Sequence, residues 1–198
     1  MDIQELINYI SFLNKFSSIK RFVKISKDDD FESDSEHSYQ LALVGWYVSE
    51  KLGLELDIKL ILKYALVHDL VEVYAGDTDP HGDDIEFILS KEQREQEAIR
   101  IIAKMYPDFH SLQESIARYE SLVDNESKYI YLLDKILPII NTYLTKNSYY
   151  RERGVSYNCW KNWFAGKQAK ACFYDTKFQP LLDKVVVFFK NVDRGFFG

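Results

Sequence analysis

Metal-ligating side chains occur in this sequence at positions where the pattern calls for an apolar residue. The stretch from 58 to 73, IKLILKYALVHDLVEV, has the periodicity of a core helix, and His68 and Asp69 interrupt it side by side. A buried carboxylate without a partner is strongly unfavourable, so Asp69 requires a cation or strong hydrogen-bond donors. Glu72 follows one turn after His68 and projects from the same side of a helix.

Two further polar residues interrupt helical patterns elsewhere in the chain. Asp134 lies within YIYLLDKILPII, where Ile130 and Leu137 share its helix face, and His37 lies in SDSEHSYQ near the start of an amphipathic helix. Two imidazoles and two carboxylates suit a divalent ion such as Mn, Fe, Co, Ni or Zn. Ligands carried by separate helices leave coordination positions open for water and substrate, which is typical of a catalytic metal site.

Each of these residues also has an ordinary explanation. A single histidine on a helix is more often a core or surface residue, and an HD dipeptide occurs often by chance. A buried aspartate such as Asp134 can cap a neighbouring helix or pair with an arginine. The combination carries the metal hypothesis, because three independent accidents explain it less well than one shared ion.

The elements that must position these side chains are helices. Glycine and proline are scarce, at 8 and 4 of 198 residues, and long apolar–polar periods favour helices over a β-sandwich or barrel. The pattern predicts helices over 2–16, 35–52, 58–74, 91–106, 108–122, 125–145 and 177–190, with polar loops over 17–35 and 77–90. From Ser148 onward the chain is rich in aromatic residues and less periodic.

Composition narrows the class of protein. With 46% hydrophobic residues the chain can bury a real core, and its net charge of −6 disfavours a protein that binds nucleic-acid polymers. Cys159 and Cys172 form no CxxC pair and cannot build a disulfide framework, so we expect a reduced environment. The first residues, MDIQELINYI, do not read as a signal peptide, and no stretch is apolar enough for a membrane span. We therefore expect a cytoplasmic protein without a membrane partner.

The sequence resembles the HD-domain phosphohydrolase superfamily, and within it the branch of 5′-deoxynucleotidases. The matching stretches are SEHSYQLALVGWYV, ALVHDLVEVYAGDTDP, KEQREQEAIRIIAKMYP, YESLVDNESKYI and YIYLLDKI. The resemblance implies an all-α fold: one helical bundle domain of about six to eight helices, over 1–198. Its core would cover about 5–145, and 146–198 would be an aromatic-rich, helical C-terminal extension that packs on the core. A homodimer is possible.

The resemblance also implies roles for individual residues. His37, His68, Asp69 and Asp134 would hold one divalent ion (Co, Mn, Fe, Ni, Zn or Mg). Glu72 would be the general acid/base, and Asp69 would help to align the attacking water. The substrate-binding residues would be Arg21, Phe22, Asp77, Thr78, Asp79 and Pro80. Phe22 stands where the deoxynucleotidases have a tryptophan that helps to reject ribose.

Ordinary explanations remain open for these secondary residues. Glu72 can be an exposed carboxylate at a helix end, Asp77 a turn residue or cap, and Arg21 a solvated charge. We expect His81 and His110 to be surface residues. We expect Glu92, Arg94, Glu95 and Glu97 to form a solvated helix face.

The function that follows is hydrolysis of (deoxy)nucleoside 5′-monophosphates to nucleoside and phosphate. One alternative is an enzyme of the same fold with another phosphoester substrate: a cyclic nucleotide, a dinucleotide or a guanosine alarmone. The other is a helical module that binds a nucleotide without catalysis.

Overall fold

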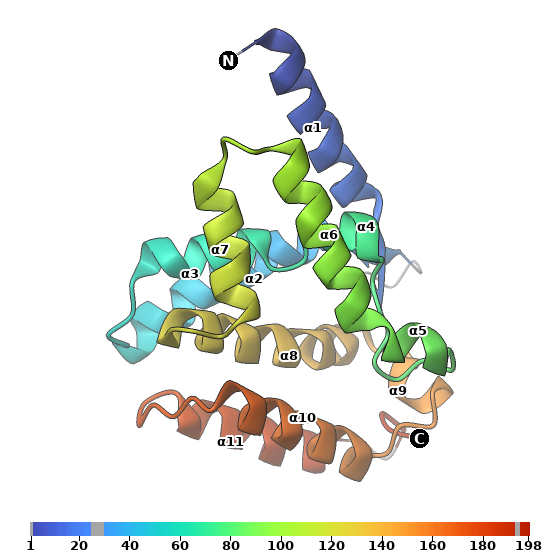
Figure 1. Cartoon of the computed structure of the whole chain (residues 1–198). Helices are drawn as coiled ribbons and strands as arrows, with labels where there is room; N and C mark the ends of the chain where they lie inside the picture. Colours follow the sequence, from blue (N-terminus) through green and yellow to red (C-terminus); the bar gives the residue numbers. More distant parts are fainter. Residues whose placement is uncertain (1, 25–29, 193–194) are drawn as a thin grey trace.

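The computed structural model describes residues 2–24, 30–192 and 195–198, and it is mainly helical (Figure 1). Eight helices of ten or more residues lie in these ranges: α1 (Ile3–Ser18), α2 (Asp34–Leu52), α3 (Ile58–Val67), α6 (Lys91–Met105), α7 (His110–Glu120), α8 (Asn125–Thr145), α10 (Tyr157–Ala171) and α11 (Gln179–Lys190). Three shorter helices are α4 (Glu72–Ala75), α5 (Ile85–Leu89) and α9 (Tyr149–Glu152). The predicted all-α class is confirmed.

Helix α2 begins and ends where its sequence contains capping residues. The Ser33 side chain accepts a hydrogen bond from the backbone of Glu36, whose carboxylate in turn accepts one from the Ser33 backbone. This capping box satisfies backbone donors that the first turn leaves free. At the other end Gly53 has φ +60°, a left-handed conformation that glycine adopts without strain. Because α2 begins at Asp34, His37 lies in its first turn.

Helix α8 lies at the centre of the core. It packs against α2 and α3 on one side and against α10 on another, and α10 and α11 form the layer below it in Figure 1. Its residues Ile130, Leu132 and Leu133 are almost completely buried. Asp134, in the same buried segment, therefore points into the protein interior rather than into solvent.

The predicted loop over 17–35 is wrong for part of its length. Residues Lys20–Lys24 form strand β1 and Phe31–Ser33 form strand β2, which pair in an antiparallel arrangement. Residues 25–29 of the predicted loop lie outside the described part of the chain. The pairing places Arg21 and Glu32 next to the start of α2.

The C-terminal segment contains a helix that the periodicity did not indicate. The resemblance implied a helical extension over 146–198, but the periodicity predicted a helix only over 177–190, the range that contains α11, and none at α10. Trp160 and Phe164 of α10 are fully buried and stacked, with ring centroids 5.7 Å apart. They belong to the same apolar cluster as Ile130 of α8, so the C-terminal helices share the core.

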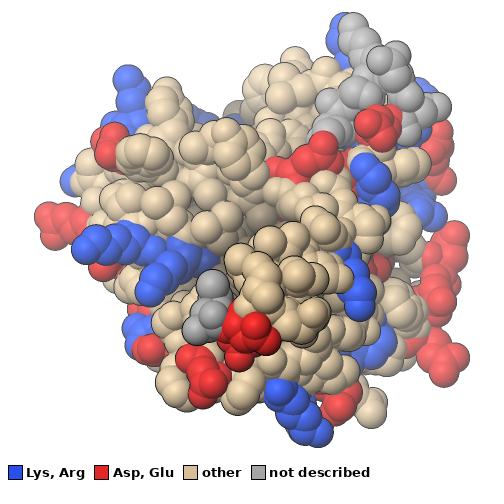
Figure 2. Space-filling model, turned by 90° about the horizontal axis from the view of Figure 1, so that it is seen from above, with Lys and Arg blue, Asp and Glu red and all other residues tan. Residues whose placement is uncertain are grey.

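On the face seen in Figure 2, acidic and basic groups are interspersed around a largely uncharged area and form no large patch of one charge. Among the described residues, none of the helices is long and apolar enough to cross a bilayer.

Close helix packing at Gly45 yields a first prediction. A Cβ atom added there would lie 2.9 Å from Ile130 Cδ1 and 3.1 Å from Ile61 Cγ2, inside the core between α2, α3 and α8. We expect Gly45→Ala to lower the free energy of unfolding by about 1–3 kcal/mol, the usual cost of overpacking. Thermal or urea denaturation measures this.

Gly166→Ala on α10 is the matched control, because nothing lies within 4 Å of the added atom. It should leave stability unchanged or raise it by up to about 1 kcal/mol through helix propensity. Equal stability of the two variants would contradict the packing argument.

Candidate metal centre and substrate pocket

The HD pair lies in a turn at the end of a helix, not inside one. The predicted helix over 58–74 is interrupted: α3 ends at Val67, and α4 begins at Glu72. Between them the backbone hydrogen bonds are of the i→i+3 kind, from Leu70 N–H to the Val67 carbonyl at 3.1 Å and from Glu72 N–H to the Asp69 carbonyl at 2.9 Å. This tighter winding lets His68, Asp69 and Glu72 reach one buried region.

The structure brings the four predicted ligands together. Donor atoms of His37, His68 and Asp69 all lie within 4.8 Å of one another. Asp134 Oδ1 lies 2.9 Å from His37 Nε2 and 3.8 Å from His68 Nε2. Ligands about 2.0–2.2 Å from a common ion have separations of this size. The geometry is therefore compatible with one ion bound by residues from α2, the α3–α4 turn and α8.

The buried ring nitrogen Nε2 of His68 indicates whether these residues can bind a metal ion. His68 Nδ1 lies 2.9 Å from the backbone carbonyl of Ala65, so the ring donates there and Nε2 is the nitrogen left to bind a metal. Nε2 is buried and lies 2.9 Å from Asp69 Oδ2 and 3.8 Å from Asp134 Oδ1. Two carboxylate oxygens beside a buried ring nitrogen require a positive charge there, which a proton on the ring or a bound cation supplies. The donor set therefore fits a divalent ion.

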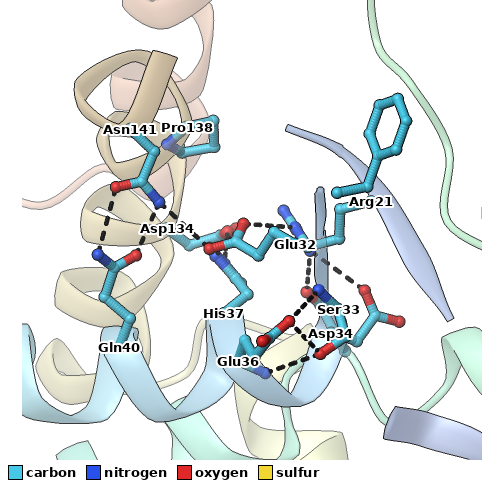
Figure 3. A network of polar contacts seen from close by, with 12 residues as sticks. Arg21, Glu32, Ser33, Asp34, Glu36, His37, Gln40, Asp134, Pro138 and Asn141 are labelled. Carbon is cyan, nitrogen blue, oxygen red and sulfur yellow. Dashed lines mark hydrogen bonds and ion pairs between the residues drawn. The ribbon is translucent and has the colours of Figure 1, made fainter. Parts of the chain in front are cut away.

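A second layer of polar residues holds His37 (Figure 3). Its Nδ1 lies 3.4 Å from Glu32 Oε2, and Asn141 Nδ2 donates to Glu32 Oε1 at 3.2 Å. Gln40 and Asn141 are joined by hydrogen bonds between their side-chain amides. A carboxylate behind a ligating histidine fixes the ring orientation and raises its basicity. Glu32 was not predicted as a site residue, because it lies in a polar stretch with no periodic signal.

Arg21 is buried among carboxylates rather than solvated. Its Nη1 donates to Asp69 Oδ2 at 2.5 Å and lies 3.6 Å from Asp34 Oδ1, and its Nε lies 3.4 Å from Glu32 Oε2. It also lines the pocket described below, so the same guanidinium faces both the metal centre and the pocket. The explanation of Arg21 as a plain surface charge is wrong.

Two buried acids stand beside the centre. Oxygens of Asp34, Asp69 and Glu72 lie within 4.8 Å of one another, and Glu72 is almost completely buried. Burial and the neighbouring Asp69 raise the pKa of Asp34 to about 7 and hold that of Glu72 well above its usual range. The explanation of Glu72 as an exposed helix-end carboxylate is therefore wrong. Asp34 was missed, because an acid at a helix start is ordinarily a cap.

Neighbouring positive charges lower the pKa values of the other two carboxylates, those of Asp69 and Asp134. Burial alone would raise the pKa of Asp69, but His68 and Arg21 hold it below its usual range. Burial also opposes ionisation of Asp134, and Lys135 and His37 overcome it, so the pKa of Asp134 is well below its usual range. Both groups are held as anions, the form that binds a cation.

A cavity of about 430 Å³ opens onto this centre. It is lined by all six residues predicted to bind substrate (Arg21, Phe22, Asp77, Thr78, Asp79 and Pro80), together with Glu72 and Asp69. Its outer wall is aromatic and includes His81 and Trp163, whose ring centroids are 5.5 Å apart. His81 is thus a half-buried pocket residue, and the expectation that it lies on the surface is wrong; His110 is exposed.

Two of the predicted pocket residues have partners within the protein. The Thr78 hydroxyl accepts a hydrogen bond from Arg94 at 2.9 Å. Asp79 accepts a hydrogen bond from the Tyr149 hydroxyl and pairs with Arg153 at 3.0 Å. These contacts fix the loop that carries Asp77 at the rim of the cavity.

Arg94 corrects the prediction of a solvated face on α6. It donates to the Ala75 carbonyl and to the Phe87 carbonyl, and its guanidinium lies 3.4 Å over the Phe87 ring. The backbone at Gly76, with φ +76°, passes close to the same ring. Arg94 therefore anchors the turn after α4 and Glu95 is half-buried, so the predicted solvated face holds only for Glu92 and Glu97, which are exposed.

The chain is similar to known proteins over most of its length. A family model described as HD domain matches residues 13–172. The 5′-deoxynucleotidase HDDC2 of Dictyostelium discoideum is 36% identical over 83 residues, which cover 37% of this chain and 44% of that protein. The human protein of the same name is 31% identical over 106 residues, covering 52% of this chain and 50% of the relative. The match thus spans about half the length of these relatives.

A solved structure shares the fold over nearly the whole chain. The crystal structure of a "predicted metal-dependent phosphohydrolase" from Magnetospirillum magnetotacticum MS-1 superposes with a TM-score of 0.77 and 21% identity, covering 99% of this chain and 98% of the other.

The family match covers most of the chain, so the protein belongs to the HD domain family of helical proteins. The resemblance inferred from the HD pair and its flanking motifs is confirmed. The matched region extends beyond the resemblance over 5–145 and includes all of α10, the helix that the periodicity missed.

The ligand geometry generates a second prediction. His68→Ala and Asp134→Asn should each lose the bound divalent ion, because each removes or weakens one of the four predicted ligands. Metal analysis of the purified proteins by mass spectrometry measures the stoichiometry. Added Mn²⁺ or Co²⁺ should raise the melting temperature of the unaltered protein and not that of the variants.

His110→Ala is the control, since His110 is exposed at the start of α7. Unchanged metal content in both ligand variants would remove His68 and Asp134 from the ligand set.

Proposed function

We propose that this protein is a metal-dependent phosphohydrolase that converts (deoxy)nucleoside 5′-monophosphates to nucleoside and inorganic phosphate. The observation that carries the proposal is the buried Nε2 of His68, set among His37, Asp69 and Asp134 at the inner end of a cavity that Arg21 also lines. The 5′-deoxynucleotidase names of the relatives support the substrate class.

The roles of the residues follow from their positions. His37, His68, Asp69 and Asp134 would hold one divalent ion, which when bound supplies a Lewis acid for the phosphoryl oxygens and lowers the pKa of water. Arg21, already fixed by Asp69, presents guanidinium N–H groups to the phosphate and neutralises its charge.

Glu72 is the group placed to move the proton. It is buried and lines the cavity, and burial and the neighbouring Asp69 hold its pKa well above the usual range, which favours the protonated form. In the reaction the water oxygen forms a bond to phosphorus, the bond from phosphorus to the 5′ oxygen breaks, Glu72 gives its proton to that leaving oxygen, and a proton of the water passes to Glu72. Nucleoside and phosphate result, and Glu72 returns to its starting state.

The cavity suits a nucleoside attached to this phosphate. At about 430 Å³ it lies within the range of pockets for small organic ligands, roughly 300–1,000 Å³. The His81 and Trp163 rings offer flat surfaces for a base, and Asp77 at the rim offers a hydrogen-bond acceptor for the sugar. Phe22 is 39% exposed and has no hydrogen-bonding group, so selection against a ribose hydroxyl would rest on its shape alone.

The third prediction tests the reaction directly. The metal-loaded protein should release phosphate from deoxynucleoside 5′-monophosphates, and Glu72→Gln should retain the metal but lower kcat by a factor of about 10²–10⁴, the usual contribution of a general acid/base. Phosphate release and metal content are measured on the same samples. Residual turnover above a tenth of the original would remove Glu72 from the proton transfer.

The competing readings are separated by the same assay. A panel of cyclic nucleotides, dinucleotides and guanosine alarmones, tested with Mn²⁺ or Co²⁺, identifies an HD enzyme of different substrate choice. A metal-loaded protein that binds nucleotides and turns over none of the panel would instead be a binding module, and the proposal would be wrong.

The fourth prediction concerns Arg21. Arg21→Lys keeps a positive charge near Asp69 but loses the planar two-nitrogen fork, so we expect KM to rise and kcat to fall, with kcat/KM reduced about tenfold or more. Steady-state kinetics measure both constants. Lys20→Ala is the control, because the neighbouring Lys20 is exposed, is not among the residues that line the cavity, and lies 4.0 Å from Asp30 and 3.0 Å from the Phe31 carbonyl.

A stability measurement separates the two functions of Arg21. Arg21→Ala should also lower the melting temperature, because it leaves buried carboxylates uncompensated, whereas Arg21→Lys should lower it less. If Arg21→Lys has normal kinetics, the guanidinium does not contact the phosphate.

A further inference from the structure

A second, smaller cavity reaches the metal centre from another side. It has a volume of about 110 Å³ and shares five lining residues with the large pocket: Asp69, Lys91, Asp134, Lys135 and Lys167. The buried residues His68 and Asp134 and the half-buried Asp69 line it, together with the exposed Lys170. Both cavities therefore adjoin Asp69 and Asp134, two of the proposed metal ligands.

Four lysines line this small cavity. Lys91 comes from α6, Lys135 from α8, and Lys167 and Lys170 from α10. Such a gathering of ammonium groups is unexpected in a chain of net charge −6. Burial and the neighbouring Lys135 and Lys170 lower the pKa of Lys167 to about 8, which is the signature of like charges held close together.

The acids of the cavity do not balance these lysines. A divalent ion would neutralise Asp69 and Asp134, and Glu95 pairs with Lys91 at 3.1 Å. The remaining acid, Glu120, has its pKa raised to about 7 by burial and by Glu95, so it is only partly ionised at neutral pH.

Two lysines lack an anionic partner. Within the described parts of the chain, neither Lys167 nor Lys170 has a carboxylate within 4.0 Å of its nitrogen. Lys167 lies 5.2 Å over the Trp163 ring and Lys170 lies 5.5 Å over the Tyr131 ring. Each ammonium group is held in place by an aromatic face and still has free N–H donors.

We propose that the small cavity is a separate binding site for inorganic phosphate, which receives the phosphate released at the metal centre. The site rests on the proposed function for the source of its ligand. A volume of about 110 Å³ holds a small tetrahedral oxyanion and is well below the roughly 300 Å³ of a pocket for a nucleoside-sized ligand. Because the cavity shares its inner residues with the large pocket, phosphate can move into it while the nucleoside still occupies the aromatic wall.

Lys170 offers the cleanest test because it lines only the small cavity. Calorimetric titration of the metal-loaded protein with inorganic phosphate should give about fivefold weaker binding for Lys170→Ala, the effect expected for removal of one partly exposed charge. Lys161→Ala on the same helix is the matched control: Lys161 is exposed, lines neither cavity and should leave the affinity unchanged.

Kinetics supply a readout that a purely structural role would not move. Lys170→Ala should raise the inhibition constant of phosphate about fivefold and leave KM for the nucleotide within about twofold, since the nucleoside lies in the other cavity. Equal phosphate affinity in the unaltered protein and Lys170→Ala would overturn the proposal. So would a KM that rises in step with the inhibition constant, or an unaltered protein that binds no phosphate at all.

Failure of the proposed function gives a different result. If no nucleotide is hydrolysed but phosphate binding still depends on Lys170, the small cavity is an oxyanion site and the assigned reaction is wrong. If nucleotides are hydrolysed and phosphate binding ignores Lys170, the reaction is supported and the second site is overturned.

Discussion

The structure depends on the compensation of negative charge in the interior. Glu32, Asp34 and Asp69 converge on the guanidinium of Arg21, which lies within 4.0 Å of all three. Asp134 draws on Lys135 and His37. Burying a carboxylate costs several kcal/mol unless an opposite charge and good hydrogen bonds offset it. A bound cation would complete this compensation, so the folding free energy and metal affinity of this protein are linked.

The helices that could be predicted are those whose apolar residues face one side. Helix α8 was predicted with correct bounds and α2 to within a residue, because each combines a helical period with capping residues at its start. The hairpin of β1 and β2 was missed since its strands are short and rich in charged residues. Helix α10 was missed because Trp160 and Phe164 pack on one face while Trp163 faces the pocket, so its apolar residues show no single stripe.

The contrast between periodic and polar segments also explains which site residues could be predicted from the sequence. His68, Asp69 and Asp134 were recognisable because a polar residue in an apolar helix violates the pattern around it. Glu32 and Asp34 lie in a polar stretch, where a carboxylate violates nothing, and only the pairing of the two strands brings them to the ligands. Whether Glu72 and Arg21 are solvated charges or site residues could not be decided from the sequence. Burial depends on tertiary packing and has no local signal in either segment.

The residues predicted to bind the metal and some of the residues that line the two cavities lie on different helices. The four predicted metal ligands come from α2, the α3–α4 turn and α8, whereas Trp163, Lys167 and Lys170 come from α10. These three residues are spaced i, i+4 and i+7, so they share one helix face, and Trp160 and Phe164 on the adjoining face fix that helix in the core. Substitutions on the first face would alter which base or anion is bound without moving a ligand. An α10 with a different outward face would therefore give the same metal centre a different substrate.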